Sequence, residues 1–365
     1  MATLESRGSR DVVQALDLVT LNQFVFVVCG GRQHIEELNY SLRALRRHTK
    51  NCITVVTELR RNEVPIDHHN VIEATTPASF SHHQASIYLK TSLHRILPAG
   101  PCYCYLDTDV IALSPQVDAI FAERKGAVNF AADHCNLSRF SPYAVKCGCL
   151  AQNESELEII RSLERGLTTP EDIAAESQSR EGPVRRLLRQ LRPPSPKNWS
   201  FDTRANLWRT PDGRNVYDLQ CKHLAKAIQS KFDIRVKNQA WQHWNGGVFL
   251  FDAQGHSFLE AWHRKTLMIL QDPYWSTRDQ GTLVATAWEM GLEKARLLPD
   301  VFNYIADYDK GTVCVVDDAL QSKIGEKLYY CNPAFIHIYH HFGDEKWAVW
   351  SWVDAMCKMD GERPK

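Results

Sequence analysis

Two aspartates one residue apart end an apolar run in the middle of the chain. The segment "CYCYLDTDVIAL" places Asp107 and Asp109 directly after five residues of strand type. Buried carboxylates are costly unless a cation or hydrogen-bond donors meet them, and residues i and i+2 of an extended chain face the same way. The spacing predicts either a shared divalent cation such as Mg²⁺ or Mn²⁺, or a turn in which Asp107 accepts hydrogen bonds from nearby backbone amides.

A second group of chemically active residues lies near the C-terminus. The segment "FIHIYHHFGDEKWAVW" runs from a hydrophobic strand into histidines, a glycine and a lysine. We expect His340 to be a third ligand for a cation held by two carboxylates, and imidazole favours Mn²⁺ over Mg²⁺. Lys346 would offset the charge of a diphosphate, and Gly343 would let the backbone approach it closely. The alternative is that His337, His340 and His341 are ordinary polar residues at a strand edge.

Two further segments combine polar residues with glycines. "WNGGVFLF" contains Asn245 and Gly246 at the start of a strand, which suits close approach of a ligand or a simple bulge. In "STRDQGTLV", Thr277 and Gln280 fit a helix capping box, and the helix dipole favours Asp279 in the first turn. Functional and capping roles are both open for this second segment.

These four segments occur in the order found in retaining glycosyltransferases of the GT-A fold, and the chain most closely resembles the glycogenin and galactosyltransferase-like family 8. Residues 340–346 match that family's closing H-x-x-G-x-x-K without gaps, although the usual proline before the tryptophan is absent. The likeness extends from about Phe24 to Trp347 except for 154–236, which does not match. The family more often has Asp-Ala-Asp or Asp-Ser-Asp, so the identity of the sugar stays open.

The resemblance implies a metal-dependent transferase that moves a sugar, with retention, from a nucleotide-sugar donor to a hydroxyl acceptor. The donor is expected to be a UDP-sugar, and the acceptor a glycan, a lipid-linked or a small-molecule hydroxyl. The implied metal is Mn²⁺, with Mg²⁺ as the alternative, and its implied ligands are Asp107, Asp109 and His340. The other implied site residues are Asn245, Asp279 and Gln280 around the transferred sugar, and Val28, Cys29, Gly30, Lys90, Asp107, Gly246, Gly343 and Lys346 around the donor.

Alternating strand and helix patterns must position these residues. We expect strands at 24–29, 52–59, 69–74, 102–106 and 245–252, and helices at 32–49, 84–97, 258–270 and 278–290. This order predicts an α/β fold with a mixed, mostly parallel sheet flanked by helices, Rossmann-like and, by resemblance, GT-A. Ligands of such sheets bind beyond the carboxyl ends of the strands, where "CGG" and "DTD" both fall.

The chain divides into four regions by composition. Residues 1–20 form an N-terminal segment, 21–153 a nucleotide-sugar-binding half, 154–236 a partly irregular insertion, and 237–365 an acceptor and catalytic half with the C-terminal ligand segment. The insertion is polar and basic and is interpreted either as a solvated excursion or as an acceptor-side lid. Its segment 184–192 carries four arginines at helical spacing, which suits a peripheral membrane contact.

Overall composition excludes several classes of protein. The chain has 365 residues with 43 basic and 43 acidic side chains, so no net charge attracts nucleic acid. It has neither an apolar run of spanning length nor a secretory pattern at its start, which predicts a cytoplasmic protein, at most peripheral at the inner face of a membrane. Two C-x-C pairs, Cys102/Cys104 and Cys147/Cys149, are interpreted as small buried residues in a reducing compartment in preference to metal or disulfide sites.

Three rival functions use the same residues. A haloacid-dehalogenase-like phosphatase would use Asp107 and Asp109 with the acidic pair in "CVVDDAL" at 314–320. A catalytically inactive sugar-nucleotide-binding module would retain the fold but not the reaction. A nucleotidyltransferase would need a glycine-rich basic loop after the first strand, and "CGGRQH" is a poor version of one.

Overall fold

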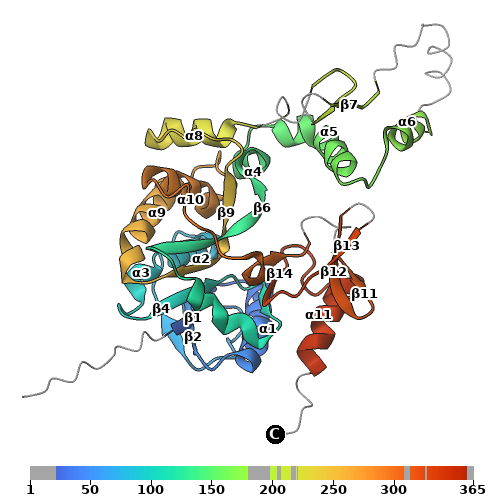
Figure 1. Ribbon diagram of the computed structural model, residues 1–365. Helices are drawn as coiled ribbons and strands as arrows, with labels where there is room; N and C mark the ends of the chain where they lie inside the picture. Colours follow the sequence, from blue (N-terminus) through green and yellow to red (C-terminus); the bar gives the residue numbers. More distant parts are fainter. Residues whose placement is uncertain are drawn as a thin grey trace, which may run out of the picture.

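A six-stranded sheet forms the centre of the molecule (Figure 1). The computed structural model describes residues 22–179, 198–203, 207–214, 219, 221–307, 313–324 and 327–359. Across the sheet the strands are β3 (Val71–Glu73), β2 (Cys52–Thr57), β1 (Asn22–Val27), β4 (Cys102–Leu106), β9 (Gln242–Phe251) and β6 (Val128–Asn136). The first four run parallel, and β9 is antiparallel to both of its neighbours. The predicted mixed, mostly parallel α/β fold is therefore confirmed.

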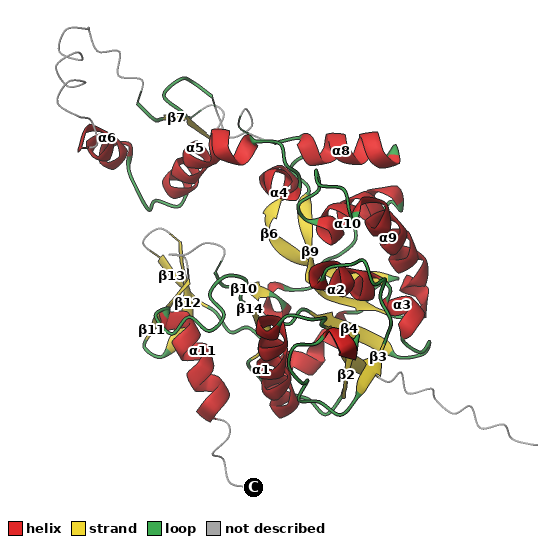
Figure 2. Cartoon of the chain, turned by 180° about the vertical axis from the view of Figure 1, so that it is seen from behind, coloured by secondary structure: helices red, strands yellow, loops and turns green. Residues whose placement is uncertain are grey.

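Alternate residues of each strand face two different helical layers. Phe24 and Phe26 of β1 pack with the apolar stripe of α1 (Arg32–His48), which is the helix predicted from that stripe. Val25 and Val27 face the opposite layer. That layer consists of α2 (His82–Thr91), α3 (Leu93–Ile96), α4 (Leu137–Ala144), α8 (His223–Phe232), α9 (His256–Ile269) and α10 (Arg278–Glu289), and Figures 1 and 2 show it from both sides.

Helix boundaries differ from the sequence-based expectation at one place. The predicted helix at 84–97 is broken at Ser92 into α2 and α3. The start of α2 is fixed by a capping box, because the Ser81 hydroxyl accepts from the Gln84 amide while the Gln84 side chain accepts from the Ser81 amide. Helix α2 therefore begins in a defined orientation and points Lys90, in its last turn, toward the end of β4.

A small second sheet brings the C-terminal segment to the aspartates. It consists of β10 (Tyr304–Ile305), β14 (Phe335–His337) and β5 (Val110–Ala112), and β5 begins immediately after Asp109. A third sheet of β11 (Val313–Val316), β12 (Ala319–Ile324) and β13 (Lys327–Tyr330) packs beside α11 (Ala348–Met359). Four short 3₁₀ helices, at Leu59–Arg61, Pro115–Glu123, Ala253–Gly255 and Asp300–Phe302, complete the connections.

The inserted segment gathers at one end of the molecule, above β6 and β9 in Figure 1. Its elements are α5 (Cys149–Glu164), α6 (Pro170–Ser179), β7 (Ser200–Asp202) and β8 (Leu207–Arg209), with a small apolar cluster of its own. The basic segment 184–192 lies outside the described residues. Strands β6 and β9, which precede and follow the insertion, are neighbours in one sheet; the division into four regions stays a prediction.

Hydropathy along the helices bears on membrane crossing alone. Within the described ranges, every helix is too short or too polar to cross a bilayer. The expected cytoplasmic location and the peripheral membrane contact stay predictions.

Candidate active site

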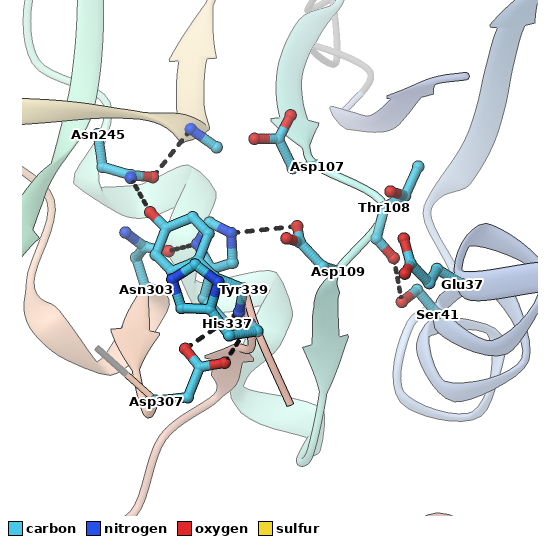
Figure 3. Close-up of polar contacts among 12 residues, drawn as sticks. Glu37, Ser41, Asp107, Thr108, Asp109, Asn245, Asn303, Asp307, His337 and Tyr339 are labelled. Atoms are coloured by element: carbon cyan, nitrogen blue, oxygen red, sulfur yellow. Dashed lines mark hydrogen bonds and ion pairs between the residues drawn. The ribbon is translucent and has the colours of Figure 1, made fainter. Parts of the chain in front are cut away.

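Asp107, Asp109 and His337 form a group in which one ligand atom from each residue lies within 4.8 Å of the others (Figure 3). Asp107 follows β4 and Asp109 precedes β5. Strand β14 runs antiparallel to β5 with His337 opposite Val110, and the Ile338 amide donates to the Asp109 carbonyl at 3.1 Å. This strand pairing sets the imidazole beside the two carboxylates.

The position of the histidine corrects the sequence-based expectation, which named His340. His340 lies beyond the end of β14, where its backbone amide donates to the Asp307 carboxylate, and its side chain lines a different cavity. The physical reason is strand register: His337 is the last residue paired with β5, so it alone of the three histidines is held against Asp109.

The group has the chemistry of a divalent-cation site. The Asp109 Oδ1 and His337 Nε2 atoms are 3.1 Å apart, but neither has an aligned hydrogen bond in the described part of the chain. The other ring nitrogen, His337 Nδ1, lies 2.8 Å from Asn303 Oδ1, the outer contact that orients a metal-binding imidazole. Burial raises the pKa of Asp109, but His337 outweighs this and lowers it, and Asp109 correspondingly raises the pKa of His337 against its own burial. Two carboxylates and one imidazole fit Mn²⁺.

Gly247 makes room for this group. A Cβ on Gly247 would come within 2.5 Å of the His337 ring and 2.9 Å of an Asp107 oxygen. The strand pairing of β4 and β9 continues to this point, because the Asp107 amide donates to the Gly247 carbonyl at 2.8 Å. On the other side, Ser41 of α1 donates to the Thr108 carbonyl at 2.8 Å and holds the turn between the aspartates (Figure 3).

Lys90 is the buried cation of the site. Its Nζ lies 3.1 Å from Asp107 Oδ1 and 3.1 Å from Asp279 Oδ2, so one ammonium joins the end of β4 to the start of α10. Burial lowers the pKa of Lys90, but the two carboxylates outweigh this and raise it. Burial likewise raises the pKa of Asp279, and Lys90 outweighs this and lowers it. Both groups are therefore charged at neutral pH.

A cavity of about 330 Å³ opens beside these charges. Of the predicted donor-binding residues, Val28, Cys29, Lys90 and Asp107 line it, together with Asp109 and Asp279. Gly30 lies next to this wall with its backbone against the His82 ring. The carboxyl ends of β1 and β4 thus meet at one cavity, as the order of the strands predicts.

Asn245 lies behind the site rather than in it. The residue is fully buried and lines neither of the cavities described here. Its amide nitrogen donates to the Tyr339 hydroxyl and to Asp133, and its oxygen accepts from the Gly247 amide at 2.8 Å. The structure does not bring Asn245 to a sugar; it makes Asn245 a support for Gly247 and Tyr339. Gly246 does face the site, where a Cβ would lie 3.5 Å from Lys90 and Gln280.

A second cavity, of about 750 Å³, adjoins the first through Tyr339, which lines both. Gln280 and Thr277 belong to its wall, and the predicted capping box is absent, since Thr277 makes no side-chain cap. Within the described residues, Thr277 Oγ1 and Gln280 Oε1 are buried without a hydrogen-bond partner. Helix α5 of the insertion supplies another part of the wall, with Glu158, Arg161, Ser162 and Arg165.

The remaining C-terminal motif residues lie away from the first cavity. Lys346 and Gly343 are exposed in the turn before α11, and the Lys346 amide donates to Asp344 at 3.1 Å. The cation that meets the aspartates is Lys90 instead. Sequence reasoning did not find His337, Tyr339 or Asn303 as site residues. The alternation of "HIY" along the strand was a usable signal for the first two, but nothing in the local sequence indicated Asn303.

Comparisons with known proteins place the chain among remote structural neighbours. No family model and no curated protein sequence matches it. It is similar to the bifunctional glycosyltransferase WbbM, with 12% identity and a TM-score of 0.46 over 94% of this chain and 50% of that one, so it spans half the length of WbbM. It is also similar to the galactosyltransferase LgtC with donor and acceptor sugar analogues (11% identity, TM-score 0.42, 94% and 96% covered) and to mouse xyloside xylosyltransferase 1 (12%, 0.40, 87% and 97%). All three are glycosyltransferases, the class of enzyme that the four sequence motifs resemble.

Proposed function

We propose that the chain is a metal-dependent glycosyltransferase that moves a sugar from a nucleotide-sugar donor to a hydroxyl acceptor. The observation that carries the proposal is the meeting of Asp107, Asp109 and His337 at the mouth of a cavity that Lys90 also lines. A cation site beside a fixed ammonium suits a diphosphate, which needs positive charge from both sides. The sequence resemblance to family 8 supports the same reaction class.

In this proposal the donor lies along the carboxyl ends of β1 and β4. The nucleoside takes the wall of Val28 and Cys29, and the diphosphate takes the end at Asp107 and Asp109. Mn²⁺ held by Asp107, Asp109 and His337 would act as a Lewis acid on the leaving nucleoside diphosphate. Lys90 is positioned to exchange part of its pairing with Asp107 for a phosphate oxygen, which would offset charge on the leaving group without moving the helix.

The sugar is placed where the two cavities meet. Asp279 lines the first cavity and Gln280 the second, so consecutive residues at the start of α10 face both sides of this junction. Because Lys90 keeps Asp279 ionised, its carboxylate supplies a fixed negative charge beside the sugar as positive charge develops there. We infer retention, with the acceptor hydroxyl attacking from the side of the leaving group and its proton passing to a phosphate oxygen.

The acceptor is placed in the larger cavity. Its wall combines aromatic faces at Phe140, Tyr143 and Tyr339 with acids at Asp133 and Asp307. Aromatic faces and carboxylates suit the apolar faces and hydroxyls of a carbohydrate. Because α5 contributes part of this wall, the insertion would take part in acceptor choice, which agrees with the interpretation of residues 154–236 as an acceptor-side element.

The phosphatase alternative is not favoured by the arrangement. Its second acidic pair, Asp317 and Asp318, forms the turn between β11 and β12 and lines neither cavity. A phosphatase of that class needs both pairs around one phosphate.

A ligand screen tests the proposal. The full chain would be heated with nucleotide sugars, with and without Mn²⁺, and product formation would be followed with simple glycosides as acceptors. A UDP-sugar should raise the melting temperature by about 5 °C or more at saturation, and only with Mn²⁺ present. Asp279→Asn should keep this shift and lose transfer, because Asp279 lies on the sugar side. Absence of a shift with every donor, or release of phosphate from an aryl phosphate, would contradict the proposal.

A further inference from the structure

We propose that Cys147, Cys149, Cys221 and His223 form a structural zinc site that closes the base of the insertion. One ligand atom from each of the four residues lies within 4.8 Å of all the others. Three sulfurs and one imidazole are a typical ligand set of structural zinc sites. The group is separate from the carboxylate site, and none of its four residues lines either cavity.

The observed separations match a tetrahedral ion. With Zn–S near 2.3 Å and Zn–N near 2.0 Å, two sulfurs of a tetrahedron lie about 3.8 Å apart, and a sulfur and a nitrogen about 3.5 Å apart. In the structure the Cys147 and Cys221 sulfurs are 3.6 Å apart. The His223 Nδ1 atom lies 3.5 Å from the Cys149 sulfur and 3.4 Å from the Cys221 sulfur. A disulfide would need sulfurs about 2.05 Å apart.

Local backbone geometry explains how each pair of ligands converges. Cys147 and Cys149 flank Gly148, whose φ of 79° turns the chain at the start of α5. That conformation is easy only for glycine and brings the two thiols to one side. The sequence-based interpretation of this C-x-C pair as strand residues is therefore corrected, whereas Cys102 and Cys104 do lie on a strand and share one face of β4. Cys221 and His223 come from the start of α8.

The group also has an outer contact of the kind that supports metal ligands. The Ser141 hydroxyl donates to the Cys221 sulfur at 3.1 Å and accepts from the Leu224 amide at 2.9 Å. Such hydrogen bonds orient a thiolate and stabilise its charge. Ser141 is fully buried, so the contact is shielded from solvent.

The location of the site indicates its role. Cys147 and Cys221 are 74 residues apart, as are Cys149 and His223. An ion held by all four would join the two ends of the inserted segment and hold α5 against α8, much as a crosslink closes a long loop. Helix α5 supplies part of the wall of the larger cavity, so the zinc would fix that wall by holding its first residue.

Metal analysis of the full chain tests this inference. Protein would be washed with EDTA to remove weakly held ions, and its zinc content measured by mass spectrometry. We expect about one zinc per chain. Cys149→Ser and His223→Gln should lose nearly all of it, whereas Cys52→Ser, which changes a cysteine outside the group, and Asp109→Asn, which changes the carboxylate site, should retain it. Cobalt in place of zinc should give the thiolate charge-transfer and visible bands of a tetrahedral site in the wild type and not in Cys149→Ser.

Three results would overturn the inference. They are wild-type protein without zinc, equal zinc in Cys149→Ser and Cys52→Ser, and a Cys147–Cys221 disulfide in peptides from unreduced protein. Limited proteolysis gives a separate readout of the role. Removal of zinc should speed cleavage between residues 150 and 220 and leave the sheet protected, and an unchanged cleavage pattern would contradict the crosslinking role. None of these readouts depends on transferase activity.

Discussion

The chain holds two groups of metal-binding side chains that differ in almost every physical respect. At the edge of the central sheet, Asp107, Asp109 and His337 offer hard oxygen and nitrogen ligands next to an open cavity. At the base of the insertion, three thiols and His223 offer soft ligands that surround one point without a cavity. Open sites leave positions for substrate, and closed sites serve structure. One chain thus separates a proposed catalytic cation from a proposed structural one by ligand type and access.

The two groups also reach their geometry by different routes. The sheet-edge group depends on strand register, because β14 and β5 must pair for His337 to meet Asp109. The insertion group depends on two short C-x-C and C-x-H turns that meet across 74 residues. Changes at one group should therefore leave the other intact, and the predictions below examine that independence.

Asp109→Asn should have the largest effect. Because it removes one anionic ligand from the open group, we expect transfer to fall about 10²- to 10³-fold or more. Initial rates at saturating donor and Mn²⁺, together with Mn²⁺ affinity by calorimetry, measure this. Zinc content should not change. A variant with wild-type rates would show that the carboxylate group is not the catalytic cation site.

Gly247→Ala should be next in size. A methyl group at this position would come within 2.5 Å of the His337 ring, so the imidazole must shift. Displacement of a catalytic group by about 1 Å costs on the order of 10²-fold in rate. Gly246→Ala is the matched comparison, since its methyl group would meet Lys90 and Gln280 only at 3.5 Å. Equal rates for the two alanine variants would contradict the assigned role of Gly247.

Ser141→Ala examines the closed group. Loss of an outer hydrogen bond to a metal ligand costs about 10- to 100-fold in metal affinity. Competition with a zinc chelator would measure the change, and transfer rates with Mn²⁺ would show whether the open group is affected. Unchanged zinc affinity would mean that the Ser141 contact to Cys221 serves packing alone.

Glu58 holds buried charge without any metal, and its variant should have the smallest effect. Burial raises the pKa of Glu58, but hydrogen bonds from Thr76, Arg61 and Arg60 outweigh this and bring it to about 2. Because the folded pKa lies below the ordinary 4.5, the carboxylate stabilises the fold above about pH 4.5 and loses this contribution as pH falls toward 2. Glu58→Gln should lower the free energy of unfolding by about 2 kcal/mol at pH 7.

Urea denaturation at pH 7, 4 and 3 checks this prediction, with the exposed Glu73→Gln as control. The difference between wild type and Glu58→Gln should shrink at the two lower pH values. A difference that stays constant down to pH 3 would contradict the sign of the pKa shift.

Much of the central sheet could be predicted because its signals are local. The alternation in β1, the apolar stripe of α1 and the strand ending at Asp107 each depend on a few neighbouring residues. Strand order then brought Val28, Cys29, Lys90 and Asp279 to one cavity, as the general rule for such sheets implies. The capping box predicted at Thr277 failed because the packing of α10 turned both side chains toward the larger cavity.

By itself, the amino-acid sequence determined the alternation of strands and helices, the aspartate pair at a strand end and the cation opposite it, because periodicity and chain direction are local properties. Tertiary structure alone decided that His337 rather than His340 meets Asp109, and that Cys147 and Cys149 meet Cys221 and His223. Those choices depend on the register of strands and on the closure of a long insertion, where contacts are made between residues that no local pattern relates.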